Sequence, residues 1–173
     1  MKRFLSILLC LAAFATHAQE KPKVTPAMKR FVYQTSSSIY KEMHEAAAGN
    51  FNVVYKDGDK WVFKFSFRGE DNEMMSDDEF FESFEFEIAP PKGNTFEIKE
   101  VDFAKSNVIY TRSCFCADAG PRVLYEGNIT GKKVGRKKWL ITFEGSINAR
   151  PDRQEKPFPR QWKGYFNPGK LVY

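Results

Sequence analysis

The sequence predicts a mainly β fold: an antiparallel meander of about eight strands, arranged as a barrel or a two-sheet sandwich and preceded by one N-terminal α-helix. Three observations predict this architecture. Apolar residues recur every three or four positions between residues 26 and 48, which is the period of an amphipathic helix. From Phe51 onward, apolar and polar residues alternate, which is the period of a strand. Short turns rich in Gly, Pro and Asn separate many of these alternating runs.

Residues 1–18 carry the pattern of a secretory signal peptide. Lys2 and Arg3 precede an apolar stretch over residues 4–15, and small residues lead to a cleavage site near Ala18. We therefore expect a secreted or periplasmic protein whose mature chain, residues 19–173, forms a single β-rich domain. The whole chain is 42% hydrophobic and 28% charged, and no later run approaches the roughly 18 apolar residues of a membrane-spanning helix.

The N-terminal helix is predicted over residues 26–48. Thr25 and Pro26 are typical of a helix start, with a hydroxyl cap and a proline at the first helical position. Gly49 is typical of a helix end. We expect the apolar face of this helix to pack on the sheet. That face comprises Met28, Phe31, Val32, Thr35, Ile39, Met43 and Ala46.

The clearest predicted strands form a hairpin. Residues 51–56 and 60–68 alternate between apolar and polar positions, and Asp57-Gly58 between them suits a two-residue turn. The aromatic residues of the second strand share one face, which we expect to lie in the core. The other strand candidates are residues 84–88, 96–98, 107–116, 122–130, 138–148 and 161–167.

Most signals of catalysis are missing from the sequence. The predicted mature chain has one histidine, His44, which excludes any metal motif that needs two histidines. No serine stands in a nucleophile elbow, and no phosphate-binding or dinucleotide-binding glycine pattern is present. We therefore name no catalytic residue, no cofactor and no metal-ligand set, and expect a protein that binds without catalysing.

An acidic stretch follows the predicted hairpin. Its density of carboxylates suggests calcium binding, but the spacing lacks the alternating ligands and turn glycine of a calcium loop. A solvated acidic face is the favoured interpretation, and Glu85 and Glu87 are expected on the solvent side of a strand. The candidate patch comprises Glu70, Asp71, Glu73, Asp77, Asp78 and Glu79.

A basic loop is predicted between strands 122–130 and 138–148. Its charges suit either a soluble hairpin tip, which we favour, or a contact with an anionic partner. Nucleic acid is not expected, because stacking aromatic residues are lacking and the adjacent Trp139 alternates with core positions. The loop comprises Lys132, Lys133, Arg136, Lys137 and Lys138.

Cys114 and Cys116 are the cysteines that remain after the signal peptide. In a regular strand, residues two apart share a face with Cα atoms roughly 6.6 Å apart, close to the upper limit for a disulfide. A pair of structural thiols is favoured. A strained, reducible bridge or a soft-metal site such as one for Cu(I) remains the alternative.

These observations together predict an exported, non-catalytic binding protein that is monomeric. One interpretation is a binder of a small hydrophobic ligand, because an eight-stranded barrel lined by aromatic residues can enclose one small molecule. A second is an envelope protein that binds another protein through its sheet face or its charged loops. The alternative from a different class is a thiol-based redox or soft-metal-handling protein that uses Cys114 and Cys116.

Overall fold

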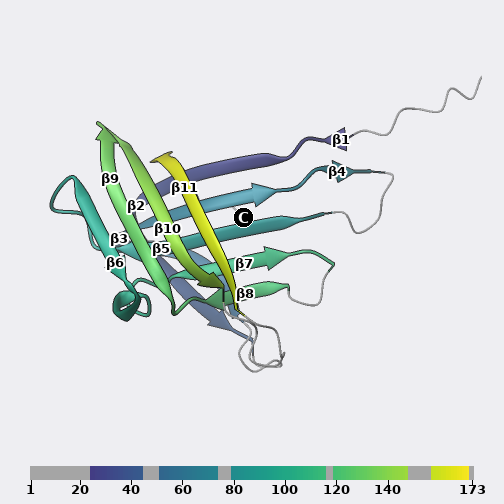
Figure 1. The fold of residues 1–173 in the computed structure, drawn as a ribbon, viewed down its shortest axis with the longest axis horizontal. Helices are drawn as coiled ribbons and strands as arrows, with labels where there is room; N and C mark the ends of the chain where they lie inside the picture. Colours follow the sequence, from purple (N-terminus) through teal and green to yellow (C-terminus); the bar gives the residue numbers. More distant parts are fainter. Residues whose placement is uncertain (1–23, 45–50, 74–78, 116–118, 148–156, 172–173) are drawn as a thin grey trace, which may run out of the picture.

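The computed structural model describes residues 24–44, 51–73, 79–115, 119–147 and 157–171. In these ranges the chain is mainly β-structure (Figure 1). No helix there has the length and apolar character needed to span a membrane. The elements are β1 (Val24–Thr25), β2 (Met28–Met43), β3 (Phe51–Arg68), β4 (Asp71–Asn72), β5 (Phe81–Ile88), β6 (Thr95–Lys99), the short 3-10 helix η1 (Glu100–Asp102), β7 (Ile109–Ser113), β8 (Gly120–Val123), β9 (Gly127–Gly135), β10 (Lys138–Ile147) and β11 (Phe158–Pro168).

Nine strands form one mixed sheet in the order β6-β9-β10-β11-β2-β3-β5-β7-β8, and β1 pairs with β4 in a separate two-stranded sheet. Neighbours are antiparallel except β11 and β2, which run parallel over a contact of two residue pairs. The end strands β6 and β8 do not pair with each other, so the sheet is not a closed barrel. β8 is four residues long and contains Pro121, which lacks a donor, so it offers a poor edge for closure. The mainly β prediction is confirmed, and the barrel alternative is wrong.

The sheet folds on itself into two layers. In Figure 1, β9, β10 and β11 cross in front of β3, β5 and β7. Rings from both layers meet between them, and the ring centroids of Phe84 in β5 and Phe143 in β10 lie 4.5 Å apart. The main core occupies this space. It comprises Tyr33, Phe63, Phe65, Phe84, Phe86, Ile98, Phe103, Val108, Tyr110, Leu124, Ile129, Trp139, Ile141, Phe143, Ile147 and Phe166.

The predicted helix over residues 26–48 is wrong. Met28–Met43 form strand β2, and residues 45–48 lie outside the described residues. β2 is rich in β-branched and aromatic side chains, which favour a pleated surface over a helix. His44 follows the end of β2, lies in neither a helix nor a strand, and is exposed.

A bulge in β2 explains why its apolar residues imitate a helical period. Phe31 and Tyr33 pack with the main core, as a regular alternation requires. Ser36 then has a positive φ of 53°, and Ser37 pairs with two residues of the facing strand. The extra residue turns Ile39 to the opposite face of the sheet, where it joins a second cluster. The broken alternation produced the spacing of three and four.

The predicted hairpin turn at Asp57-Gly58 is also wrong. β3 runs through these residues from Phe51 to Arg68 and pairs with β2 on both sides of the bulge. Gly58 is needed there for close packing, because a Cβ at this position would lie 2.0 Å from the Ser38 hydroxyl oxygen. The glycine therefore marks a bend within the long hairpin of β2 and β3.

The end of the β2–β3 hairpin beyond this bend packs on the layer that contains β3, β5, β7 and β8. It covers the outer face of that layer, which is the face turned away from the main core. A second apolar cluster forms there from residues of β2, β3 and β7, with partly buried neighbours around it. The sheet of β3, β5, β7 and β8 is consequently covered on both faces over part of its area. The cluster comprises Ile39, Phe51, Val62 and Ile109, and its neighbours are Val53, Tyr55, Val123 and Leu171.

The strand predicted over residues 122–130 is two strands in the structure. β8 ends at Val123, and β9 begins at Gly127 in the other half of the sheet. Gly127 has a positive φ of 140°, which a side chain would disfavour, and it lets the chain turn between layers. The buried Leu124 lies in this connection and donates its N–H to the carbonyl of Val108 at 2.9 Å. The strand predicted over residues 138–148 is confirmed over residues 138–147 as β10, and residue 148 lies outside the described residues.

Candidate functional site

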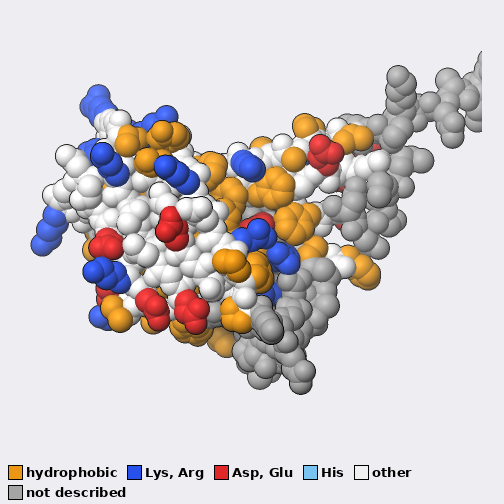
Figure 2. All heavy atoms as spheres, in the orientation of Figure 1, with side chains coloured by type: hydrophobic (Ala, Val, Ile, Leu, Met, Phe, Trp, Pro, Cys, Tyr) orange, Lys and Arg blue, Asp and Glu red, His pale blue; other side chains and the backbone are white. Residues whose placement is uncertain are grey.

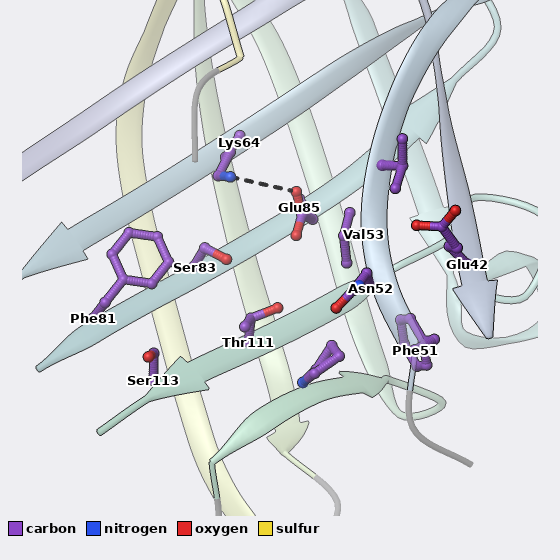
Figure 3. Close-up of a pocket in the computed structure, with 12 residues that line it drawn as sticks. Glu42, Phe51, Asn52, Val53, Lys64, Phe81, Ser83, Glu85, Thr111 and Ser113 are labelled. Atoms are coloured by element: carbon purple, nitrogen blue, oxygen red, sulfur yellow. Dashed lines mark ion pairs between the residues drawn. The ribbon is translucent and has the colours of Figure 1, made fainter. Parts of the chain in front are cut away.

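A groove of about 590 Å³ lies on the outer face of the layer that contains β3, β5, β7 and β8 (Figure 3). The folded-back end of the β2–β3 hairpin lines one side, and β5, β7 and β8 line the other. Small-molecule sites typically have volumes of roughly 300–1,000 Å³, so the groove fits one small ligand. It is lined by Glu42, Phe51, Asn52, Val53, Val54, Lys64, Phe81, Ser83, Glu85, Thr111, Ser113 and Pro121.

Strand alternation directs polar side chains into this groove. In β5, Phe84 and Phe86 belong to the main core, so Ser83 and Glu85 point to the opposite face. In β7, the residue before Thr111 belongs to the same core, so the Thr111 side chain points into the groove as well. The floor is therefore polar, whereas Phe and Val side chains of β3 and β5 contribute apolar walls.

A buried ion pair lies at the floor of the groove. The ammonium of Lys64 is 3.9 Å from Oε2 of Glu85, the ion pair drawn as a dashed line in Figure 3. Their side chains are 4% and 2% exposed. The Tyr55 hydroxyl donates a hydrogen bond to the same carboxylate oxygen. The Lys64 ammonium also lies 5.1 Å from the centroid of the Tyr55 ring. Tyr55 thus connects the folded-back hairpin to both charged groups.

Burial perturbs both groups of this pair. Loss of solvent raises the pKa of the Glu85 carboxyl above its ordinary value, although Lys64 and the Tyr55 hydrogen bond oppose the rise. Loss of solvent likewise lowers the pKa of the Lys64 ammonium, which Glu85 opposes and Arg30 reinforces. Both shifts favour the uncharged forms. The floor of the groove therefore has little net charge, whether the proton that the pair shares is on Lys64 or on Glu85.

Replacing Glu85 by glutamine is expected to change how stability depends on pH. Because the folded pKa of Glu85 is raised, the stability linked to its protonation is complete below about pH 4.5 and is lost as the pH rises through the folded value. The wild type should therefore lose stability relative to Glu85→Gln as the pH rises above about 4.5. Urea unfolding of both proteins over a series of pH values measures this difference. A difference independent of pH would contradict the assignment.

The neighbouring Glu87 has a structural role. Its Oε2 accepts the Ile39 backbone N–H at 2.7 Å, and its Oε1 accepts from the Asn107 amide at 2.7 Å and the Lys60 ammonium at 2.5 Å. Glu85 and Glu87 are 1% and 2% exposed, so their predicted place on the solvent side of a strand is wrong. The folded-back hairpin covers this face, which the strand alternation alone does not reveal.

Thr111 supplies the groove with an unused polar atom. Its hydroxyl oxygen is buried and has no hydrogen-bond partner among the residues that the structure describes. A buried polar atom without a partner costs free energy, and a ligand group that reached it would recover that cost. With Lys64 and Glu85 nearby, the groove can hold an apolar body and hydrogen-bond one polar group.

The predicted acidic patch is not assembled into a metal site in the part of the chain that the structure describes. Glu70, Glu73 and Glu79 are exposed, and Asp71 is half-buried in the small sheet of β1 and β4. Asp77 and Asp78 lie outside the described residues. No group of three or more potential His, Cys, Asp or Glu ligands is close enough to hold a metal ion among the described residues.

The predicted basic loop lies at the junction of β9 and β10. Its residues Lys132, Lys133, Arg136, Lys137 and Lys138 are all exposed. The Tyr33 hydroxyl donates a hydrogen bond to the Lys137 carbonyl at 3.2 Å, which ties this tip to β2. Trp139 is 2% exposed and belongs to the main core, as its alternation predicted.

The predicted cysteine pair falls at the edge of the described chain. Cys114 follows the end of β7, is half-buried and is disulfide-bonded. Cys116 lies outside the described residues. Because β7 ends at Ser113, the regular strand geometry assumed for this pair does not extend to it.

Cys114 is expected to resist alkylation in the native protein. A disulfide sulfur is not a nucleophile, so iodoacetamide without reductant should leave Cys114 unlabelled. Peptide mass spectrometry after labelling measures the result, and the same sample treated with reductant first provides the positive control. Labelling of Cys114 without reductant would contradict the disulfide.

The space between the layers, where a barrel would hold a ligand, is filled by side chains. A cavity lined by Phe31, Phe65, Phe84, Ile141, Phe143, Trp162, Gly164 and Phe166 has a volume of only about 10 Å³. That is about the smallest space that admits one water molecule. Here the aromatic rings form a packed core, whereas the groove on the outer face has room for a ligand.

No protein-family model matches this sequence, no curated protein matches it, and no solved structure matches its fold. The geometry alone therefore identifies the groove. The sequence prediction did not include Lys64, Ser83 or Thr111. One usable signal was present: Val62 shares a face with Lys64, and an apolar residue there indicates that this face is also covered.

Proposed function

We propose that this chain is an exported, non-catalytic binding protein that holds one small, uncharged, amphipathic molecule in the outer groove. The observation that carries the proposal is the Thr111 hydroxyl, which has no partner in the described part of the chain and lies beside the buried Lys64–Glu85 pair in a groove with apolar walls. Sites for small molecules combine these same features: apolar walls, a few convergent polar groups and perturbed pKa values.

The electrostatics of the groove favour an uncharged ligand. A buried charge needs a compensating partner, and Lys64 and Glu85 already compensate each other. A ligand hydroxyl or carbonyl can hydrogen-bond to Thr111 without disturbing that balance. The apolar part of the molecule would contact Phe51, Val53 and Phe81 on the groove walls.

Replacing Thr111 by valine separates binding from stability. Valine has nearly the same shape, so the variant should be as stable as the wild type or about 1 kcal/mol more stable, because an unpartnered buried hydroxyl is lost. Ligand binding should weaken in the same variant. Urea unfolding measures the first effect, and native mass spectrometry of protein purified from its own host measures co-purifying ligand. A clear loss of stability would show that the hydroxyl has a structural partner.

A second variant blocks the groove without touching the core. Ser113 lines the groove and is exposed, so Ser113→Trp fills the space with little cost in folding. Thr130→Trp introduces the same side chain at an exposed position of β9 and serves as the control. The proposal expects a co-purifying molecule with wild type and Thr130→Trp, and its loss with Ser113→Trp. Retention by all three proteins, or no bound molecule in the wild type, would overturn it.

A thiol-based role is the second candidate, because Cys114 is disulfide-bonded at the end of the strand that lines the groove. Redox-active disulfides have reduction potentials well above those of structural ones, which lie below about −300 mV. Equilibration of the native protein in glutathione buffers measures this potential. A value below about −300 mV would end the redox candidate and leave a structural bridge.

A further inference from the structure

A second pocket, of about 410 Å³, lies at the seam where β11 meets β2. None of the residues that line the groove lines this pocket. It is lined by Tyr33, Gln34, Thr35, Trp61, Arg136, Lys137, Pro168 and Gly169.

Trp61 provides the pocket with a rigid aromatic surface. Its ring stacks on Tyr33 with centroids 5.4 Å apart and planes 19° apart, and its edge meets Trp139 at 6.1 Å. Trp61 is half-buried, so the core holds one part of the indole while another part lines the pocket. A flat ligand ring can stack on such a surface with little loss of side-chain freedom.

Hydrogen bonds fix the walls of this pocket. Gly169 donates its N–H to the Tyr33 carbonyl at 3.0 Å, and Leu171 donates its N–H to the Gln34 side-chain oxygen at 3.1 Å. The Tyr33 hydroxyl holds the Lys137 carbonyl at 3.2 Å. The tip of the β9–β10 hairpin is therefore tied beside the aromatic surface, which keeps the pocket formed without a ligand.

The rim of the pocket is cationic. Arg136 and Lys137 line it, and neither forms an ion pair with a carboxylate in the described part of the chain. Figure 2 shows Lys and Arg side chains gathered at the end of the molecule where β9 and β10 meet. Strand β9 (Gly127–Gly135), which forms one side of this hairpin, carries no acidic side chain. An anionic group at the rim would find two donors.

We propose that this pocket binds a six-membered ring that carries a carboxylate, with the ring stacked on Trp61 and the carboxylate at Arg136 and Lys137. The volume fits one such ring with its substituents. A sugar acid and an aromatic carboxylate share this chemistry. The site is independent of the outer groove, and it gives the basic loop a specific partner in place of general solubility.

Titration of the mature protein with galacturonate and with benzoate, followed by Trp fluorescence, tests the proposal. Each probe has an uncharged counterpart, the galacturonate methyl ester and benzamide. At least one carboxylate should bind roughly tenfold more tightly than its counterpart, and the stronger of the two identifies the source of the ring. No saturable binding of either carboxylate below about 10 mM would overturn the proposal.

Two double variants locate the binding. Arg136→Ala with Lys137→Ala removes the rim charges and should weaken carboxylate binding by roughly tenfold. Lys132→Ala with Lys133→Ala removes the same charge from the same hairpin but from residues that do not line the pocket, and should change binding less than about threefold. Equal weakening by both would show a diffuse attraction to the basic loop and overturn the site. Ser113→Trp should leave this binding unchanged.

Discussion

Replacing Glu87 by alanine is expected to lower the free energy of unfolding by about 3–5 kcal/mol, because one buried carboxylate serves three donors. It accepts the Ile39 N–H, the Asn107 amide and the Lys60 ammonium within 2.5–2.7 Å. The side chain of Glu87 is 2% exposed, so water cannot replace it easily. Removal of the Glu87 carboxylate takes away the acceptor of the Ile39 N–H in β2, just after the bulge. Urea unfolding monitored by Trp fluorescence measures the change.

The matched control for this variant is Glu97→Ala. Glu97 also accepts a hydrogen bond from an asparagine amide, that of Asn128 at 3.2 Å, and it lies 3.9 Å from the Lys99 ammonium, but it is exposed. Exposed interactions of this kind contribute about 0–1 kcal/mol, so this variant should be nearly neutral. Equal costs for the two variants would show that Glu87 does not hold the folded-back hairpin.

Local sequence patterns predicted the parts of the fold that depend on neighbours in the chain. The alternation of Phe63, Phe65 and Phe67 placed one face of β3 in the core, and the alternation around Trp139 placed that ring there too. These predictions hold because a regular strand exposes successive residues to opposite faces. They need no knowledge of which strand lies next to which.

The parts of the fold that the sequence did not predict depend on pairing between residues that lie far apart in the chain. The bulge at Ser36 and Ser37 forms where β2 meets the bend in β3, and it destroys the alternation that identifies a strand. The resulting spacing of three and four matched a helix, although Phe31, Tyr33 and Ile39 favour a strand. Tertiary pairing outweighed the apparent helix start at Thr25.

The sequence did not predict the candidate groove, because the groove also depends on contacts between residues far apart in the chain. It joins residues of β2, β3, β5, β7 and β8, and it exists because the folded-back hairpin lies over the outer face. A glutamate between two phenylalanines, such as Glu85, normally points to solvent in a half-covered sheet. The contact with Tyr55, thirty residues earlier in the chain, shows that this face is buried.

Replacing Phe63 by alanine is expected to lower the free energy of unfolding by about 3–5 kcal/mol, the usual cost of removing a large ring from a packed core. Phe63 is fully buried, and its ring joins both layers. The ring stacks on Phe86 with centroids 5.1 Å apart, and it meets Phe166 and Trp139 of the other layer at 5.7 and 6.5 Å. Chemical denaturation followed by circular dichroism measures the loss.

Two further variants keep this prediction testable if the alanine variant does not fold. Phe63→Leu retains most of the volume and should cost about 1–2 kcal/mol, because the core contacts are only partly lost. Phe115→Ala removes a ring that is 85% exposed and should stay within about 0.5 kcal/mol of the wild type. If Phe63→Leu were as neutral as Phe115→Ala, the two layers could not be packed through this ring, and the interior would have to contain a space that the filled aromatic core excludes.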